Sequence, residues 1–336
     1  MDTDLPPVLS VIIPVYNEQD AFPLMAQRLR PILDGMCVSY EVVAVDDGSS
    51  DGTATVLHRI RRTWRELRVI QLYRNCGQQA ALTAGLRRAK GMYLVSIDAD
   101  LQDPPEKIPE MLDLARRDAV DVVYGLRTDR SSDTRTKRHT AGLYYLLMRR
   151  LIGARIPRDA GDFRLLSRSA VEILLALPEQ QPVYRLLIPW LGFSSTEVTY
   201  ERAPRIAGRT KYPLIKMLRL ATNSITAFSS SPLRIATWLG IACFVAGGSL
   251  LVFALIGSTV PTWTPWLLTT VLLSGVQLLC LGVLGEYTGN IHRILQGRPT
   301  YLVRYDSDEA HPFREASPMT TAAHGTAGPS AVTTPR

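Results

Sequence analysis

Two aspartates stand one residue apart where an apolar run of the chain ends. Asp98 and Asp100 directly follow the run Met92–Ile97. Two carboxylates at the end of a strand can share a divalent cation that also holds a diphosphate, because Mg²⁺ and Mn²⁺ prefer a few carboxylate oxygens together with phosphate and water. Acidic pairs are common on surfaces, so it is the position of this pair that favours a cation site. Asp103 has a separate, structural interpretation, because it is well placed to cap a helix starting at Pro104.

A second acidic pair follows another apolar run. Asp46 and Asp47 come at the end of Tyr40–Val45 and lead into Gly48 and Ser49. Carboxylates at such a strand end could accept hydrogen bonds from the base or the ribose of a nucleotide. The alternative interpretation is an ordinary turn before the next helix.

Short apolar runs alternate with helical patterns over the first part of the chain, and these elements would position both acidic pairs. The runs are rich in Val and Ile, which is typical of buried parallel strands joined by right-handed helical crossovers. They are Val8–Val15, Tyr40–Val45, Leu67–Leu72, Met92–Ile97 and Asp121–Leu126, and the helical stretches between them are Gln19–Leu33, Thr53–Trp64, Gln78–Ala89 and Pro105–Ala115. In α/β sheets of this kind, ligands bind beyond the carboxyl ends of the strands, which is where both pairs fall.

A long stretch near the C-terminus carries no charge. From Ile235 to Gly285 there is no Asp, Glu, Lys, Arg or His, and such a stretch is long enough for two membrane spans of about 20 residues each. Gly257–Pro265, which contains prolines and a tryptophan, would form the turn between them. We therefore predict spans over residues 235–257 and 266–285, although a buried hairpin of a soluble protein could also be uncharged.

Basic residues flank this uncharged stretch on both sides. Those before it are Lys211, Lys216, Arg219 and Arg234, those after it are His292, Arg293, Arg298 and Arg304, and the predicted turn has none. By the positive-inside rule, both ends of the hairpin are expected in the cytoplasm. The N-terminus has no basic segment followed by an apolar core, so no secretory signal peptide is predicted.

Two further stretches combine an apolar stripe with basic residues. Lys137–Gly153 and Tyr212–Phe228 have the composition of helices that lie in a membrane interface, although an ordinary amphipathic surface helix would have a similar pattern. Contacts with a membrane explain the net charge of +7. Because no aromatic and basic platform is present, nucleic-acid binding is not predicted.

The ordered set of polar motifs resembles a known family. The motifs are Pro14-Val15-Tyr16-Asn17-Glu18, Val45-Asp46-Asp47-Gly48-Ser49, Arg74-Asn75-Cys76-Gly77, Asp98-Ala99-Asp100-Leu101-Gln102-Asp103-Pro104, Gly125-Leu126-Arg127, Gly161-Asp162-Phe163-Arg164 and Gly208-Arg209-Thr210-Lys211-Tyr212. Together they resemble the family 2 glycosyltransferases of the GT-A fold, and within that family the dolichol-phosphate mannose synthases and the bacterial bactoprenol glucosyltransferases. The resemblance extends from Leu9 to Arg304.

The resemblance and the hydropathy pattern together imply the organisation of an α/β protein with a membrane anchor. We expect a cytoplasmic GT-A (Rossmann-like) catalytic domain over residues 1–208, an acceptor-side loop and interfacial helix over 209–234, two spans within 235–285, a cytoplasmic segment over 286–305 and a disordered tail over 306–336. Tyr301–Val303 is expected to be a short strand that pairs with its own sheet or with a neighbouring subunit. Relatives with this two-span C-terminus form tetramers, so the resemblance also implies a homo-oligomer.

The resemblance implies a role for individual residues of the motifs. It places nucleotide-sugar contacts at Pro14, Tyr16, Glu18, Val45, Asp46, Asp47, Asp98, Ala99, Gln102 and Arg205, ligands of Mg²⁺ or Mn²⁺ at Asp98, Asp100 and Gln102, catalytic positions at Asp100, Asp162, Arg127 and Lys211, and contacts with the acceptor phosphate at Arg127, Arg130 and Arg164. Lys211 would lie on a mobile loop that closes over the donor. The sequence departs from the common pattern at Cys76, where many relatives have an aromatic residue, and we expect only a packing consequence.

The activity that the resemblance implies is an inverting, metal-dependent transfer of a hexose from a nucleotide-sugar to undecaprenyl or decaprenyl phosphate at the plasma membrane, for modification of a cell-envelope glycan. UDP-glucose is the first expectation for the donor, and UDP-N-acetylhexosamine, UDP-aminoarabinose derivatives and GDP-mannose stay open. Because a phosphate monoester has a second pKa of about 6, the acceptor is already an anion at neutral pH and needs no general base. Asp162 is therefore expected to orient sugar hydroxyls or an arginine.

Other classes of protein fit the sequence less well. A dinucleotide-binding oxidoreductase would need a GxGxxG turn after the first strand, where this chain has Pro14–Glu18. A processive polysaccharide synthase would need more spans and a QxxRW string, and neither is present. The remaining alternative is a membrane-tethered subunit that binds a nucleotide-sugar without turnover, which an assay of metal-dependent activity would distinguish.

Overall fold

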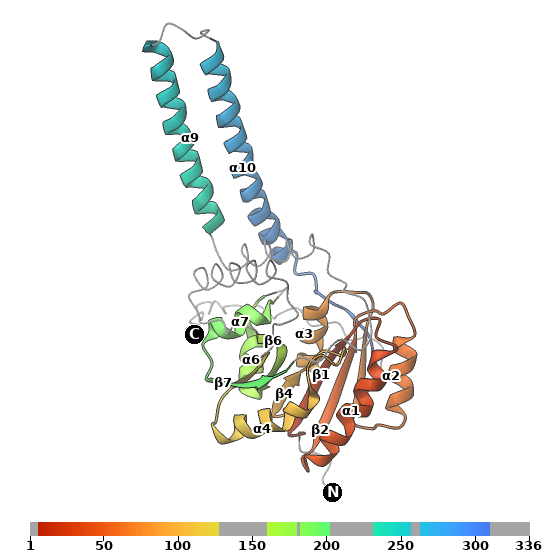
Figure 1. Ribbon diagram of the computed structural model, residues 1–336. Coiled ribbons are helices and arrows are strands. Elements are labelled where there is room, and N and C mark those ends of the chain that lie inside the picture. Colours follow the sequence, from red (N-terminus) through yellow and green to blue (C-terminus); the bar gives the residue numbers. More distant parts are fainter. Residues whose placement is uncertain (1–5, 128–159, 180–181, 202–230, 257–262, 310–336) are drawn as a thin grey trace, which may run out of the picture.

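The computed structural model describes residues 6–127, 160–179, 182–201, 231–256 and 263–309 (Figure 1). The strands are β1 (Leu9–Val15), β2 (Tyr40–Asp46), β3 (Leu67–Leu72), β4 (Tyr93–Ser96), β5 (Val122–Arg127), β6 (Ala160–Ser167), β7 (Ser195–Tyr200) and β8 (Val303–Asp306). The helices are α1 (Ala21–Gly35), α2 (Thr53–Arg61), α3 (Gln78–Arg88), the 3₁₀ helix η1 (Pro105–Lys107), α4 (Ile108–Arg117), α6 (Arg168–Ala176), α7 (Tyr184–Leu191), α9 (Ser231–Ile256) and α10 (Thr264–Leu295). The five predicted strands are therefore present as β1 to β5.

The strands form one eight-stranded mixed sheet with the order β7-β5-β6-β4-β1-β2-β3-β8. The predicted parallel arrangement is found for β1 with β2, β2 with β3 and β1 with β4. β6 lies between β4 and β5 and runs antiparallel to both, so β4 and β5 point in the same direction without being neighbours. The predicted α/β architecture is confirmed, with the correction that antiparallel strands are inserted into it.

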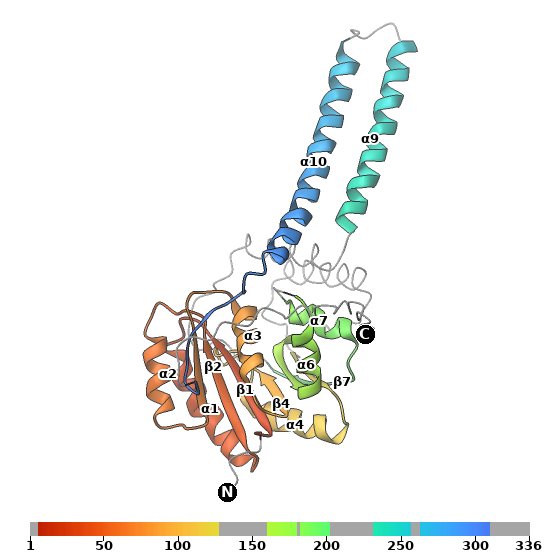
Figure 2. The same ribbon diagram turned by 180° about the vertical axis from the view of Figure 1, so that it is seen from behind.

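Helices cover both faces of the sheet because successive side chains of a strand point to opposite faces. Val11 and Ile13 of β1 pack with apolar side chains of α1, α2 and α4. Ile12, between them in sequence, packs with side chains of α3, α6 and α7 on the other face. The core thus has a layer on each side of the sheet (Figures 1 and 2). This rigid layered core holds the strand ends, and hence the acidic pairs, in place.

Two long helices, α9 and α10, lie side by side and extend away from the α/β domain (Figures 1 and 2). They occupy the segment in which the sequence predicted two spans, and α10 continues past Gly285 to Leu295. Many of their apolar side chains are exposed, including Trp238, Phe244 and Leu278. Among the described residues, one helical stretch, Leu272–Gly289, is long and apolar enough to cross a membrane, and Ala236–Ser249 in α9 is a shorter apolar stretch. One stretch in the predicted segment thus has the length and hydropathy of a span, and the predicted two-span hairpin is not confirmed.

The chain returns to the sheet after α10 and adds β8 to its edge. β8 runs antiparallel to β3 of the same chain. The strand begins at Val303, later than predicted, and includes Asp306, which the sequence analysis assigned to the disordered tail. The ordered region continues beyond it, since the Ser307 N–H donates to the Val69 carbonyl. The predicted tail boundary is therefore wrong by several residues, because composition alone did not show that Asp306 has buried partners.

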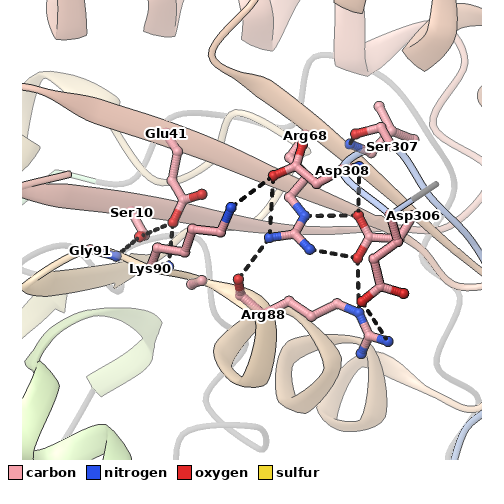
Figure 3. Close-up of polar contacts among 12 residues, drawn as sticks. Ser10, Glu41, Arg68, Arg88, Lys90, Gly91, Asp306, Ser307 and Asp308 are labelled. Carbon is pink, nitrogen blue, oxygen red and sulfur yellow. Dashed lines mark hydrogen bonds and ion pairs between the residues drawn. The ribbon is translucent and has the colours of Figure 1, made fainter. Parts of the chain in front are cut away.

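Asp306 holds β8 to the domain through a buried ion-pair network (Figure 3). Its carboxylate accepts hydrogen bonds from Arg68 Nε at 2.8 Å, Arg68 Nη2 at 2.7 Å and Arg88 Nε at 2.9 Å. Asp308, farther along, lies 3.6 Å from Arg68 Nη1 and 3.2 Å from Lys90 Nζ. The network ties the segment that leaves α10 to β3 and α3 of the α/β domain.

Replacing Asp306 with asparagine should lower the free energy of unfolding by about 3–5 kcal/mol, because Arg68 and Arg88 would lose their shared buried carboxylate. Asp308→Asn is the matched control, because Asp308 is partly exposed, its closer partner Lys90 is exposed and Arg68 is 3.6 Å away, so its loss should cost no more than about 1 kcal/mol. Burial raises the pKa of Asp306, but Arg68 and Arg88 more than offset this and hold it below its ordinary value. A depressed folded-state pKa stabilises the fold above the unfolded-state pKa, so this contribution should disappear as the pH falls below about 4. Thermal unfolding of the detergent-solubilised protein measures both effects, and equal shifts for the two variants would contradict the prediction.

Candidate active site

The predicted site residues meet at one edge of the sheet. β1, β2, β4 and β5 end at this edge, and β6 starts there because it runs antiparallel. β1 starts at the end of the domain that lies farthest from α9 and α10 (Figure 1). The carboxyl ends of the strands therefore point toward the side from which the two long helices extend.

The loops after β1 and β2 are tied together, which collects the predicted nucleotide contacts. Pro14 is the register partner of Val45 in neighbouring strands. The Asn17 N–H donates to Ser49 Oγ at 2.9 Å, and the Glu18 N–H donates to Thr53 Oγ1 at 2.9 Å. Pro14, Tyr16, Glu18, Val45, Asp46 and Asp47 therefore share one corner of the site. Their contact with a nucleotide stays a prediction.

Asp46 and Asp47 already organise the backbone around them. Asp46 Oδ1 accepts the Ser49 N–H at 3.0 Å and stabilises the turn after β2. The two oxygens of Asp47 accept the N–H groups of Cys76 and Gly77 at 2.7 and 2.8 Å. Burial raises the pKa of Asp47, and these two hydrogen bonds oppose the shift. Asp47 thus connects the β2 corner to the loop that begins α3.

Asp98 lies at the centre of a group of carboxylates that also includes Asp100, Asp103 and Asp162. Burial, followed by repulsion from Asp162, Asp103 and Asp100, raises the pKa of Asp98 to about 7, against the opposing effect of Arg127. Asp100 is partly exposed, and its Oδ1 accepts the Gln102 N–H at 3.2 Å. The turn between Asp100 and Gln102 needs a left-handed residue, and the buried Leu101 adopts φ +60° there.

The residues around Asp98 are suited to a divalent cation whose remaining ligands come from a bound phosphorylated molecule. In the described part of the chain, no group of three or more His, Cys, Asp or Glu is arranged to hold a metal ion. Magnesium and manganese, however, are commonly held by one or two carboxylates, and phosphate and water complete the octahedron. Asp98, Asp100 and the Gln102 amide supply suitable hard oxygen donors, and the crowded carboxylates supply negative charge that a cation would compensate.

Arg127, the last residue of β5, is held beside this acidic group. Its Nη2 donates to Asp103 Oδ1 and its Nε to Tyr200 Oη, each at 3.3 Å. Tyr200 also donates to Asp103 Oδ1. The predicted capping role of Asp103 is wrong: the cap position of η1 is Pro104, without a side-chain hydrogen bond, and Asp103 is buried against Arg127 instead. The sequence analysis missed Tyr200, since nothing in its local pattern shows that it faces Asp103.

Gly161 provides the space that Arg127 occupies. A Cβ at Gly161 would lie 2.9 Å from Arg127 Nη2 and 3.4 Å from its Cζ. Gly161→Ala should therefore shift the guanidinium and lower kcat/KM about tenfold, which corresponds to about 1.4 kcal/mol, with little change in the unfolding midpoint. The control is Gly35→Ala, because among the described residues nothing lies within 4 Å of a Cβ there. Unchanged kinetics for both variants would show that Arg127 tolerates the displacement.

Asp162 pairs with a buried arginine. Arg164 is 1% exposed, and its Nη2 donates to Asp162 Oδ1 at 2.5 Å and to the Gly161 carbonyl at 3.1 Å. Arg185 Nη2 of α7 lies 3.9 Å from Asp162 Oδ2. The predicted contact of Arg164 with an acceptor phosphate is not supported, because its guanidinium lies inside the domain behind Asp162. Asp162 thus contacts two arginines, and its role in orienting an arginine or sugar hydroxyls stays a prediction.

Three predicted site residues, Arg130, Arg205 and Lys211, lie outside the described residues, as do both predicted interfacial helices. One residue that the sequence analysis did not single out, Gln78, reaches the centre of the site. Its Nε2 lies 2.7 Å from Asp98 Oδ1 and 3.4 Å from Asp162 Oδ2. Its position directly after the Arg74–Gly77 motif was the one available signal.

An α/β domain of this topology, with paired carboxylates and arginines at the carboxyl edge of its sheet, is of the GT-A type. Comparison with known proteins agrees: the family described as Glycosyl transferase family 2 matches residues 10–175. A protein of Bacillus subtilis named uncharacterized glycosyltransferase YkcC is 40% identical over 88% of this chain and 93% of its own length. The chain therefore belongs to glycosyl transferase family 2 and is a glycosyltransferase.

A further relative shows the same relationship, and one solved structure is similar to the chain. The bactoprenol glucosyl transferase of Shigella phage SfII is 36% identical over 88% of this chain and 97% of its own. Among solved structures, glucosyl-3-phosphoglycerate synthase from Mycobacterium tuberculosis, in complex with Mn²⁺, UDP-glucose and phosphoglyceric acid, is 20% identical over 66% of this chain and 78% of that chain, with a TM-score of 0.47.

Proposed function

We propose that this glycosyltransferase moves a hexose from a nucleotide-sugar to polyprenyl phosphate at the cytoplasmic face of a membrane. The observation that carries the proposal is the similarity, over 88% of the chain, to proteins named bactoprenol glucosyl transferase. Bactoprenol is a polyprenyl lipid, so undecaprenyl or decaprenyl phosphate is the proposed acceptor. The same names make UDP-glucose the first donor to test, and GDP-mannose is the alternative donor of a related synthase.

The proposed cation is Mg²⁺ or Mn²⁺, held by Asp98, Asp100 and Gln102 together with the donor diphosphate. When bound, it would neutralise part of the charge of the leaving nucleoside diphosphate. Arg127 is held by Asp103 and Tyr200 at the same edge and can add positive charge where donor and acceptor phosphates approach. Arg205 and Lys211 are proposed to contact the donor phosphates from the acceptor-side segment.

The proposed chemistry is a single displacement with inversion. An oxygen of the lipid phosphate forms a bond to the anomeric carbon while the bond from that carbon to the diphosphate breaks, and the nucleoside diphosphate leaves with the electron pair. No proton has to be removed, because the acceptor is already an anion. Asp162 is therefore proposed to orient rather than to deprotonate, which agrees with its ion pair to Arg164.

Anchoring by α9 and α10 would place this site beside its lipid substrate. The exposed apolar side chains of both helices, the absence of charged residues from Ile235 to Gly285 and the basic residues on either side support a hairpin that crosses the membrane twice. Both termini would then be cytoplasmic. The expected assembly is a homo-oligomer, with a tetramer as the first hypothesis.

The test is a transfer assay with detergent-purified protein, undecaprenyl phosphate, Mg²⁺ or Mn²⁺, and a panel of UDP-glucose, UDP-N-acetylglucosamine and GDP-mannose. Mass spectrometry would follow lipid-linked sugar, and a chelator is the control. We expect one donor to give a polyprenyl-phosphate sugar that disappears with the chelator. Release of nucleoside diphosphate with the sugar on another acceptor would refute the lipid-phosphate proposal while leaving the glycosyltransferase class intact.

A further inference from the structure

Gln78 joins two carboxylates that belong to different strands of the sheet. Asp98 follows β4, whereas Asp162 belongs to β6, the antiparallel strand inserted next to it. The Gln78 amide nitrogen lies 2.7 Å from Asp98 Oδ1 and 3.4 Å from Asp162 Oδ2. An amide NH₂ group has two hydrogens, so one side chain can donate to both carboxylates.

The backbone before Gln78 explains why its amide reaches this point. Gly77 has φ +95° and ψ 154°, a conformation that is accessible essentially to glycine, and α3 begins immediately after it. The Cys76 and Gly77 N–H groups both donate to Asp47. Asp47 thus holds the loop, the loop starts the helix, and the first side chain of the helix extends between Asp98 and Asp162. The predicted nucleotide corner and the two carboxylates are connected by these contacts.

A neutral donor is suited to this position. Asp98 and Asp162 lie close enough for one amide nitrogen to reach both, so their negative charges repel each other. A glutamate in place of Gln78 would add a third negative charge to this pair, and a lysine would place a fixed cation where a divalent ion is proposed to act. The amide reduces the repulsion through hydrogen bonds and changes no charge.

We propose that Gln78 is a positioning residue that holds the cation-side carboxylate Asp98 and the sugar-side carboxylate Asp162 at a fixed separation during transfer. This inference rests on the proposed function. It assigns Gln78 no contact with the reacting atoms; its effect is exerted through the two aspartates. Asp162 Oδ1 is already engaged by Arg164, so Gln78 acts on the other oxygen, which Arg185 approaches only to 3.9 Å.

The test compares Gln78→Met with Gln79→Met. Methionine has nearly the length of glutamine but donates no hydrogen bond. Gln79 is the next residue of α3, and its Oε1 accepts the Tyr184 N–H at 3.3 Å, away from both aspartates. We expect Gln78→Met to lower kcat about 10- to 100-fold, as loss of a supporting hydrogen bond commonly does, with the KM for the nucleotide-sugar and the unfolding midpoint nearly unchanged. Gln79→Met should keep kcat within about twofold of the parent enzyme.

Two further variants, one charged and one shortened, test what the amide of Gln78 contributes. Gln78→Glu should lower kcat more than Gln78→Met, because it adds repulsion as well as removing the donor. Gln78→Asn keeps the amide but shortens the side chain by one methylene. The amide should then no longer reach both aspartates, and kcat should stay below that of the parent enzyme. Retention of kcat by Gln78→Met, or an equal loss in both methionine variants accompanied by a lower unfolding midpoint, would overturn the inference in favour of a purely structural role.

The parent enzyme distinguishes failure of this inference from failure of the proposed function. If the parent enzyme releases nucleoside diphosphate but does not glycosylate polyprenyl phosphate, the proposed acceptor is wrong. The variants are then compared by nucleoside diphosphate release, and the expected order of rates, parent and Gln79→Met above Gln78→Met above Gln78→Glu, is the same. A different order in that assay would overturn the inference independently of the acceptor.

Discussion

Replacing Asp162 with asparagine should lower the free energy of unfolding by about 3–5 kcal/mol, in addition to any effect on turnover. Arg164 is buried, and among the described residues Asp162 is the carboxylate that pairs with it. Arg164 Nε and Nη1 already have no hydrogen-bond partner in the described part of the chain. Burial lowers the pKa of Arg164 and Asp162 opposes that shift, which is the signature of a charge that depends on its partner. Without the carboxylate, a buried cation would remain uncompensated.

The double variant Asp162→Asn/Arg164→Met separates this structural cost from catalysis. Methionine removes the buried charge and keeps an apolar side chain about as long as the stem that carries the guanidinium, so the unfolding midpoint of the double variant should recover most of the loss. Thermal or denaturant unfolding in detergent measures it. No recovery would mean that the two side chains are not energetically coupled.

The same pair of variants decides how a loss of turnover is interpreted. If Asp162 orients its neighbours, its removal lowers kcat, but the pH–rate profile of the parent enzyme shows no essential carboxylate base. A profile that follows the titration of one carboxylate, together with complete loss of turnover in a well-folded Asp162→Asn enzyme, would contradict this role and identify Asp162 as a base.

Replacing Asp100 with asparagine should lower kcat/KM about a thousandfold and leave the fold intact. Asp100 is partly exposed, and its Oδ1 accepts a backbone N–H within its own turn, so an amide can replace it with little structural cost. The same substitution removes the negative charge with which Asp100 is proposed to bind the cation. The loss of one group that stabilises developing charge commonly lowers the rate by about 10²–10³, and reduced affinity for the cation adds to this.

The measurement combines turnover with a signal that needs no turnover. Electron paramagnetic resonance of Mn²⁺ in the presence of UDP would report cation binding, which should weaken in Asp100→Asn. Asp113→Asn, on the exposed side of α4, is the control and should match the parent enzyme in both measurements. If Asp100→Asn kept more than a tenth of the parent activity with the same Mn²⁺ dependence, Asp100 would not be a cation ligand.

Much of the fold could be predicted because its signals are local. The five apolar runs became β1 to β5 and the helical stretches between them became α1 to α4, with η1 at the start of the last one. The period of apolar residues and the sharp change to polar residues at strand ends are both properties of a few neighbouring residues. The strand ends then placed Asp46 and Asp98 at one edge by geometry alone.

The errors share a physical cause, which is that pairing partners distant in sequence leave no local trace. Asp103 has the local pattern of a helix cap but is buried against Arg127 and Tyr200. Asp306 lies in a stretch with the composition of a tail, yet Arg68, 238 residues earlier, binds it. In both cases a buried charge found its partner through the tertiary fold, and that partner determined the local structure.

The sequence by itself determined the class of the fold, the edge of the sheet at which the proposed site lies, the acidic and basic residues available there and the uncharged stretch that lies in α9 and α10. Only the tertiary structure decided that β6 enters the sheet between β4 and β5, because strand pairing depends on contacts across the whole domain. That insertion brings Asp162 next to Asp98 and buries Arg164 behind it. It also sets the separation between Asp98 and Asp162 that the Gln78 amide spans, so the proposed role of Gln78 depends on the folded protein.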